Sequence, residues 1–159
     1  MTNNIANETN DKSSDLQGIM KVPRPIVGMA KDFLSGHLIE FHQHIRSQLL
    51  YASTGVMTVT TQEGIWVVPP LRAVWIPAKV QHQIKASGNL SMRTLYIDPK
   101  IYFNTPEHCC VVAISALLRE LILHAVKMPT LYQPDSPEER IMAVILDQIH
   151  QMDVTPLSL

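Results

Sequence analysis

Four side chains with metal-binding chemistry stand close together in the first half of this 159-residue sequence. His42 and His44 are two residues apart, Gln48 follows on the same stretch, and His82 lies further along. Residues two apart on a β-strand project from one face, so the first two imidazoles would leave a strand together. Three neutral imidazoles leave a first-row divalent ion room for water or another ligand. The pattern predicts a metal site formed by His42, His44, Gln48 and His82.

The spacing of these residues resembles the cupin family. The cupin pattern G-x5-H-x-H-x3-E-x6-G is matched, with every spacing kept, by Gly36, His42, His44, Gln48 and Gly55. The second cupin pattern, P-x-G-x2-H, is matched by Pro77 and His82, with Lys79 in place of glycine. Gln48 replaces the usual glutamate. Because an amide oxygen is neutral and a weaker donor than a carboxylate, the site would carry one more positive charge. It would also lack the two-histidine-one-carboxylate set of non-haem iron oxygenases.

Within the cupins, three segments resemble the effector-binding domain of AraC-type transcriptional regulators. They are QLLYASTGVMTVTT, WVVPPLRAVWIPAKVQHQI and MRTLYI, and the resemblance extends over residues 26–159. It implies that a small-molecule effector enters a barrel and that helices after the barrel form a homodimer. It also implies that DNA is bound only through a C-terminal helix-turn-helix domain, which is absent from this chain. Such sensors often use the pocket without a metal, so two alternatives stay open: a Zn or Ni site, or a metal-free effector pocket.

Composition limits the function further. Hydrophobic residues at 46% and charged residues at 17% are typical of a globular domain with a core of its own. The net charge of −1 gives no overall attraction to a phosphate backbone, so we expect no DNA binding by this chain alone. Cys109 and Cys110 are adjacent, which favours reduced, buried thiols over a disulfide. The sequence shows no secretory signal and no membrane span, and we expect a cytoplasmic protein.

Short apolar runs separated by turn residues predict a mostly-β fold. We expect a cupin (double-stranded β-helix, jelly-roll) barrel over residues 26–106, after a disordered tail and extended entry at residues 1–25. Turn signals, including Thr54-Gly55 and Ser87-Gly88, predict strands at 26–33, 37–44, 48–54, 56–61, 65–68, 72–76, 80–86 and 91–98. Residues 107–152 should hold a last strand and two C-terminal α-helices, 116–128 and 137–152, that mediate dimerisation. Residues 153–159 read as a linker.

Five further residues are candidates for effector contacts: Arg46, Tyr51, Trp66, Arg72 and Trp75. A guanidinium pairs with a carboxylate in a bidentate way, and aromatic rings stack on flat ligands. Surface ion pairs for the arginines, Arg93 included, and wall positions for the aromatics are the ordinary alternatives. The sequence thus favours an effector-sensing domain. The alternative is a metal-dependent cupin enzyme of the dioxygenase or isomerase class, but no carboxylate stands in the ligand set, and we expect no enzyme. A bare dimerising domain with a filled barrel is a third interpretation.

Overall fold

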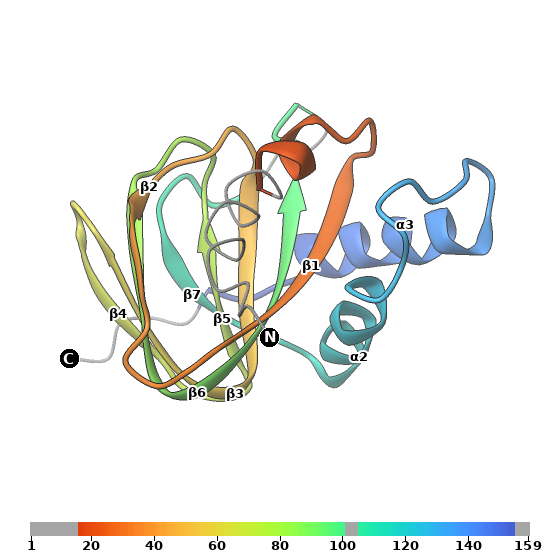
Figure 1. Ribbon diagram of the computed structural model, residues 1–159. Helices are drawn as coiled ribbons and strands as arrows, with labels where there is room; N and C mark the ends of the chain where they lie inside the picture. The colour runs from red at the N-terminus through yellow and green to blue at the C-terminus, as the bar shows by residue number, and fades with distance from the viewer. Residues whose placement is uncertain (1–15, 101–104, 155–159) are drawn as a thin grey trace, which may run out of the picture.

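The computed structural model describes residues 16–100 and 105–154. These residues form an antiparallel seven-stranded sheet that curls into a barrel, followed by two helices (Figure 1). The strands are β1 (Ile26–Phe33), β2 (Leu38–His42), β3 (Ser47–Thr61), β4 (Gly64–Val68), β5 (Arg72–Ile76), β6 (His82–Ile97) and β7 (Cys110–Ala113). The helices are α2 (Ala116–Ala125) and α3 (Pro137–His150). The predicted fold class, a mostly-β barrel followed by two helices, is confirmed.

The long strands β3 and β6 pair along their whole length and carry the other strands. β1 and β2 flank successive halves of β6, β5 and β4 flank successive halves of β3, and β7 pairs with β5 (Figure 1). The predicted chain breaks at residues 54–55 and 87–88 are wrong, since both strands continue through them. The register between β3 and β6 shifts on both sides of Thr54, which is the mark of a β-bulge. Glycine here bends a sheet rather than ending a strand.

Gly55 is required at the bulge for two reasons. Its φ is +83°, a backbone conformation that residues with a side chain rarely adopt. A Cβ added at this position would lie 2.5 Å from the backbone oxygen of Asn89 on the neighbouring strand. The last glycine of the cupin pattern therefore lets β3 and β6 pack closely where the sheet curves.

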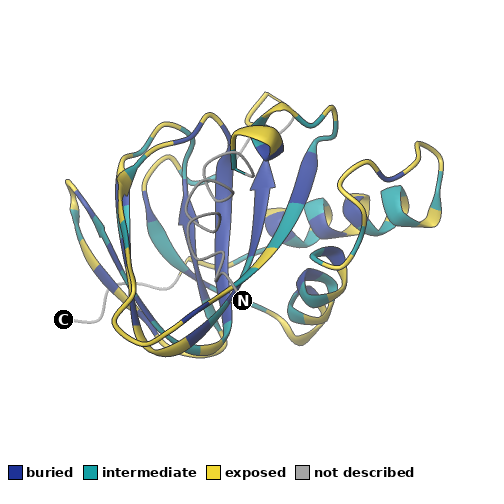
Figure 2. Cartoon of the chain, in the orientation of Figure 1, coloured by how far each residue is buried: buried dark blue, intermediate teal, exposed yellow. Residues whose placement is uncertain are grey.

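Both faces of the β3, β5 and β6 region are buried, which explains the apolar run at residues 49–52. Leu50 points into the barrel, where it packs with Val74 and Met92. Its neighbours Leu49 and Tyr51 point outward and pack under the helices. Figure 2 shows the resulting buried centre of the sheet, with exposed residues concentrated in the loops and at the far end of the barrel. The sheet is therefore buried between the barrel interior and the helical layer, and this packing holds the strands that carry the histidines in place.

The helices begin where the sequence predicts and end slightly earlier. The Ser115 hydroxyl accepts a hydrogen bond from the Leu118 amide at 3.1 Å, and the Ser136 hydroxyl accepts one from the Glu139 amide at 3.3 Å. The helices end at Ala125 and His150, short of the predicted residues 128 and 152. Their buried sides, including Ile122 and Ile145, pack on the same outer face of the sheet.

The segments on either side of the barrel are more structured than the sequence predicts. Residues 16–21 are helical, and Ile19 packs against Val27 and Tyr96, whereas residues 1–15 of the predicted tail lie outside the described part of the chain. In the predicted linker, Asp153 accepts a hydrogen bond from the Ala113 amide at 3.1 Å, and residues 155–159 again lie outside. Residues 101–104 are likewise not described. Within the described ranges, each helix is too short or too polar to cross a bilayer.

Candidate metal centre and ligand cavity

Three histidines meet at one end of the barrel. His42, the last residue of β2, lies directly opposite His82, the first residue of β6, in the strand register. His44 reaches them from the loop after β2, because the strand ends two residues earlier than predicted. One ring nitrogen from each of the three lies within 4.8 Å of the other two. The three histidines are close enough to bind a metal ion.

Backbone carbonyls fix the orientation of each imidazole. The Nδ1 atoms of His42, His44 and His82 each lie 2.8 Å from a carbonyl oxygen, which belongs to Glu40, Arg46 and Val80 respectively. A carbonyl oxygen only accepts hydrogen bonds, so each Nδ1 carries the proton. In the neutral rings each Nε2 therefore presents a lone pair, which is the tautomer that a metal ligand needs.

Gln48 adds a fourth donor atom to the cluster. Its side-chain nitrogen donates to the Thr94 hydroxyl at 2.9 Å and to the Tyr96 hydroxyl at 3.4 Å, and the Thr94 hydroxyl in turn donates to the Leu49 carbonyl. These contacts leave the amide oxygen facing His44 Nε2 at 3.0 Å. With His44 neutral, the oxygen and the nitrogen both offer lone pairs. A cation beside these two atoms would satisfy both.

Burial favours the neutral forms of His44 and His82. Desolvation lowers the pKa of His82 to about 3, assisted by the neighbouring His42 and His44. Desolvation likewise lowers the pKa of His44. His82 is fully buried, and its Nε2 is the buried side-chain polar atom without a hydrogen-bond partner among the described residues. A buried, unpaired lone pair is costly in an ordinary interior, so its presence here favours a bound ion. The donor set of three imidazoles and one amide oxygen fits a borderline divalent cation.

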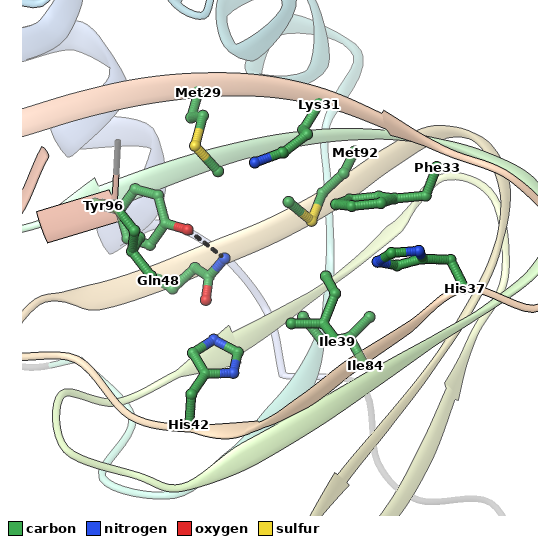
Figure 3. A pocket seen from close by; sticks show the side chains of 11 residues that line it. Met29, Lys31, Phe33, His37, Ile39, His42, Gln48, Ile84, Met92 and Tyr96 are labelled. Carbon is green, nitrogen blue, oxygen red and sulfur yellow. Dashed lines mark hydrogen bonds between the residues drawn. The ribbon is translucent and has the colours of Figure 1, made fainter. Parts of the chain in front are cut away.

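A cavity of about 170 Å³ opens directly beside this centre (Figure 3). His42 and Gln48 contribute to its wall. The remaining lining comes mostly from β1 and β6 and is largely apolar: Leu16, Met29, Lys31, Phe33, His37, Ile39, Ile84, Met92 and Tyr96. Its volume is comparable to the roughly 150 Å³ that holds one benzene molecule. The cavity therefore fits a ligand about the size of one substituted ring.

Sequence reasoning did not identify most of this lining. The alternation along β1 contained the signal, because Met29, Lys31 and Phe33 share one face of a period-2 strand. His37, which lies outside the cupin pattern, stacks on Phe33 with ring centroids 4.6 Å apart. Tyr96 packs edge-on to His44 at 5.2 Å between centroids, a contact made across the barrel that no local pattern reveals.

The five predicted effector contacts lie elsewhere. Tyr51 and Trp75 pack under the helices, and Trp66 is buried inside the barrel on β4. The Arg46 guanidinium is buried and donates to the backbone oxygens of residues 22, 24 and 25. Arg72, at the start of β5, is also not part of the cavity lining. Strand register, which sequence spacing does not reveal, turns Tyr51 and Trp75 towards the helices, whereas Trp66 shares the barrel interior without lining the cavity.

Lys79, the departure from the second cupin pattern, keeps the backbone conformation that favours glycine. Its φ is +66°, and its amide donates to the His44 carbonyl at 2.8 Å. The turn before His82 is therefore the one expected of the glycine pattern, and the lysine side chain is exposed. The substitution changes the surface and leaves the placement of His82 intact.

Residues 34–125 match the family described as the AraC-like ligand binding domain. This chain belongs to that family. The matched region includes all four residues of the centre and extends from the loop before β2 to the end of α2. The matched residues also include most of the lining of the cavity described above.

The AraC-like chain is also similar to individual proteins. It is 36% identical over 118 residues to the HTH-type transcriptional regulator NimR of Escherichia coli K12; the match covers 74% of this chain and 43% of NimR. The chain thus spans less than half of that relative's length. Among solved structures, a cupin-2 domain containing protein from Shewanella frigidimarina is 11% identical with a TM-score of 0.42, covering 46% of this chain and 72% of that one. A variant oxalate decarboxylase from Bacillus subtilis is 19% identical with a TM-score of 0.44, covering 50% and 22%.

Proposed function

We propose that this chain is the effector-sensing domain of an AraC-type transcriptional regulator. In this proposal a small molecule occupies the cavity beside the histidine centre. The observation that carries it is the direct contact between the two features: His42 and Gln48 belong both to the donor set and to the wall of a largely apolar cavity. Family membership and the similarity to a regulator with a helix-turn-helix name support a sensing role.

We further propose that His42, His44, Gln48 and His82 hold a divalent metal, Zn or Ni in preference to Fe. When bound, the metal supplies a Lewis-acidic contact point for a polar group of the effector. The chain's own residues do the rest: the backbone carbonyls hold the rings, Thr94 and Tyr96 orient the Gln48 amide, and the largely apolar walls surround the body of the effector. The neutral donor set lacks the carboxylate expected of an iron oxygenase, which favours sensing over the enzyme alternative.

Elemental analysis of the tag-free protein tests the metal proposal. We expect about one equivalent of metal in the wild type and a loss of most of it in His42→Ala and in His82→Ala. His124→Ala, which changes an exposed histidine on α2, is the control and should retain the metal. Substoichiometric metal that stays the same in all four proteins would favour a metal-free effector pocket.

The remaining elements of the proposal concern partners. We propose that a second copy of the chain docks on α2 and α3, which present exposed Leu117 and Val144. DNA would be contacted by a helix-turn-helix domain outside these 159 residues, as the name of the similar regulator suggests. A regulator of transcription works beside the chromosome, which supports the cytoplasmic location expected from the sequence.

A further inference from the structure

The charge of the centre points to the kind of ligand that it accepts. Its four donors are uncharged in the form that binds a cation: three imidazoles with the proton on Nδ1, and an amide oxygen. A divalent cation held there would keep both of its positive charges. Burying a charge without a compensating partner is strongly unfavourable in a medium of low dielectric constant.

The described surroundings do not supply the missing negative charge. Among the described residues that line the cavity there is no aspartate or glutamate, and the ionic side chain in the wall is the cation Lys31. Figure 3 shows the Lys31 amine directed over the cavity between Met29 and Met92. Glu40, the nearest acidic residue in sequence to His42, is exposed and contributes only its carbonyl oxygen. Tyr96 does not compensate either, because burial raises the pKa of its phenol and keeps it neutral.

We propose that the natural ligand is a small organic anion, and that the anion and the metal bind cooperatively. This inference rests on the proposed metal-dependent sensing function and specifies its ligand class. The anionic group would face the centre beside His42 and Gln48, and a flat or branched apolar body would lie among Phe33, Ile84 and Met92. The cavity volume of about 170 Å³ limits the body to the size of one ring. By linkage, the anion strengthens metal binding by the same factor as the metal strengthens anion binding.

The neutral side chain of Gln48 makes metal binding depend on a bound anion. A glutamate in its place would neutralise one charge within the chain, so Gln48→Glu should bind metal more tightly without an anion and should gain less from one. The near-isosteric change leaves the Tyr96 hydroxyl able to donate to the new carboxylate. The Thr94 hydroxyl could donate to it only by giving up its hydrogen bond to the Leu49 carbonyl. Lys31→Met keeps the alkyl chain and removes the ammonium group, and tests the second cation separately.

Isothermal titration calorimetry of zinc into metal-free protein tests the inference, with benzoate, benzamide and formate as probes. Benzoate has both a negative charge and an aromatic ring. Benzamide has the ring without the charge, and formate has the charge without a ring. We expect saturating benzoate to tighten zinc binding at least tenfold in wild type, formate to do so less, and benzamide to change it less than twofold. In Gln48→Glu we expect tighter zinc binding without an anion and a benzoate effect below threefold. Lys31→Met should weaken benzoate binding severalfold without weakening zinc binding in the absence of an anion.

The outcomes separate the two levels of the proposal. Zinc binding that responds equally to benzoate and benzamide, or to neither, overturns the anion inference and leaves the metal centre in place. The absence of zinc binding in wild type overturns the metal centre and the anion inference together. Thermal melts of each variant by circular dichroism identify any that fail to fold. If Gln48→Glu does not fold, the comparison of benzoate with benzamide in the wild type is sufficient to decide the inference.

Discussion

At the scale of single residues, His82 combines complete burial with an unpaired Nε2 atom. Burial lowers its pKa to about 3 in the folded chain, against about 6.5 in the unfolded chain. Between these values the unfolded state binds more protons, so acidification favours unfolding. The stability that neutral His82 allows is therefore complete above pH 6.5 and declines as the pH falls towards 3. Burial lowers the pKa of His44 as well, so both rings stay neutral, with Nε2 free to bind a metal, at pH values below the unperturbed 6.5.

We predict that metal-free protein loses stability by about 1.4 kcal/mol per pH unit below pH 6.5 from His82 alone. Urea denaturation between pH 7 and pH 4.5, with a chelator present, measures the slope. His82→Gln, which does not titrate, should give a shallower slope, whereas His124→Gln on the exposed side of α2 should match the wild type. Equal slopes in all three proteins would contradict the assignment of a buried neutral His82.

Variants at two glycines of the cupin pattern measure the cost of backbone strain separately from the cost of steric overlap. Gly36 and Gly55 both have positive φ values, +87° and +83°. A Cβ at Gly36 meets nothing within 4 Å, whereas one at Gly55 overlaps the Asn89 oxygen. Gly36→Ala should therefore cost about 1–2 kcal/mol of unfolding free energy. Gly55→Ala should cost about 1–3 kcal/mol more, from overpacking against the backbone. Denaturant titration of the two variants side by side measures the difference, and equal costs would mean that the bulge relaxes freely.

At the scale of elements, the sequence predicted strand existence well and strand continuity poorly. The alternation in residues 26–33 and the cap residues Ser115 and Ser136 act locally, and the structure follows them. The sequence predicts turns at Gly55 and Ser87-Gly88, because local chemistry does not distinguish a turn from a bulge. What distinguishes them is the partner strand, which no short window of sequence contains.

The same limit applies to the site. The sequence predicts His42, His44 and His82 together from their cupin spacing and from a shared strand face. The structure brings the three together, although His44 lies in the loop after β2 rather than on the strand. The predicted effector contacts were chosen by residue type, and Tyr51 illustrates why that choice did not find the cavity wall. It neighbours the inward-facing Leu50, so one step of the pleat places it under the helices instead.

Arg46 joins the barrel to the segment that enters it. Its guanidinium donates to the carbonyl oxygens of Val22 at 2.7 Å and Arg24 at 2.9 Å, while its own carbonyl accepts from the His44 ring. Arg24 continues the connection, because its Nε donates at 2.7 Å to the carbonyl of Tyr132, between α2 and α3. One chain of contacts thus runs from the histidine centre to the helical layer.

We predict that Arg46→Met destabilises the chain by about 2–3 kcal/mol, because it leaves three part-buried carbonyl oxygens without a charged donor. Hydrogen exchange should become faster at the amides of residues 19–25 and should rise to a smaller extent around Tyr132. Arg140→Met removes an exposed guanidinium on α3 and is the matched control, with an expected change below 0.5 kcal/mol. Unchanged exchange at residues 19–25 in Arg46→Met would show that the entry segment is held by other contacts.

At the scale of the whole molecule, the helical layer has a buried side and an exposed side. Ile145 on α3 is fully buried against the sheet, so a charged residue at that position would test folding rather than assembly. Leu117 on α2 is 53% exposed and Val144 on α3 is 41% exposed. A second copy that covers these side chains would remove apolar surface from water without disturbing the core.

We predict a homodimer in the wild type and a monomer in the Leu117→Glu/Val144→Glu double variant, because two buried charges on each copy would face the partner across the interface. Light scattering at tens of micromolar, where weak dimers with micromolar dissociation constants still persist, measures the mass. Ile65→Glu is the control, since Ile65 is 66% exposed on β4, on the side of the barrel away from the helices (Figure 1). It should remain dimeric. A monomeric wild type at this concentration contradicts dimerisation, and a dimer that the double variant preserves but Ile65→Glu disrupts would move the interface to the β4 side of the barrel.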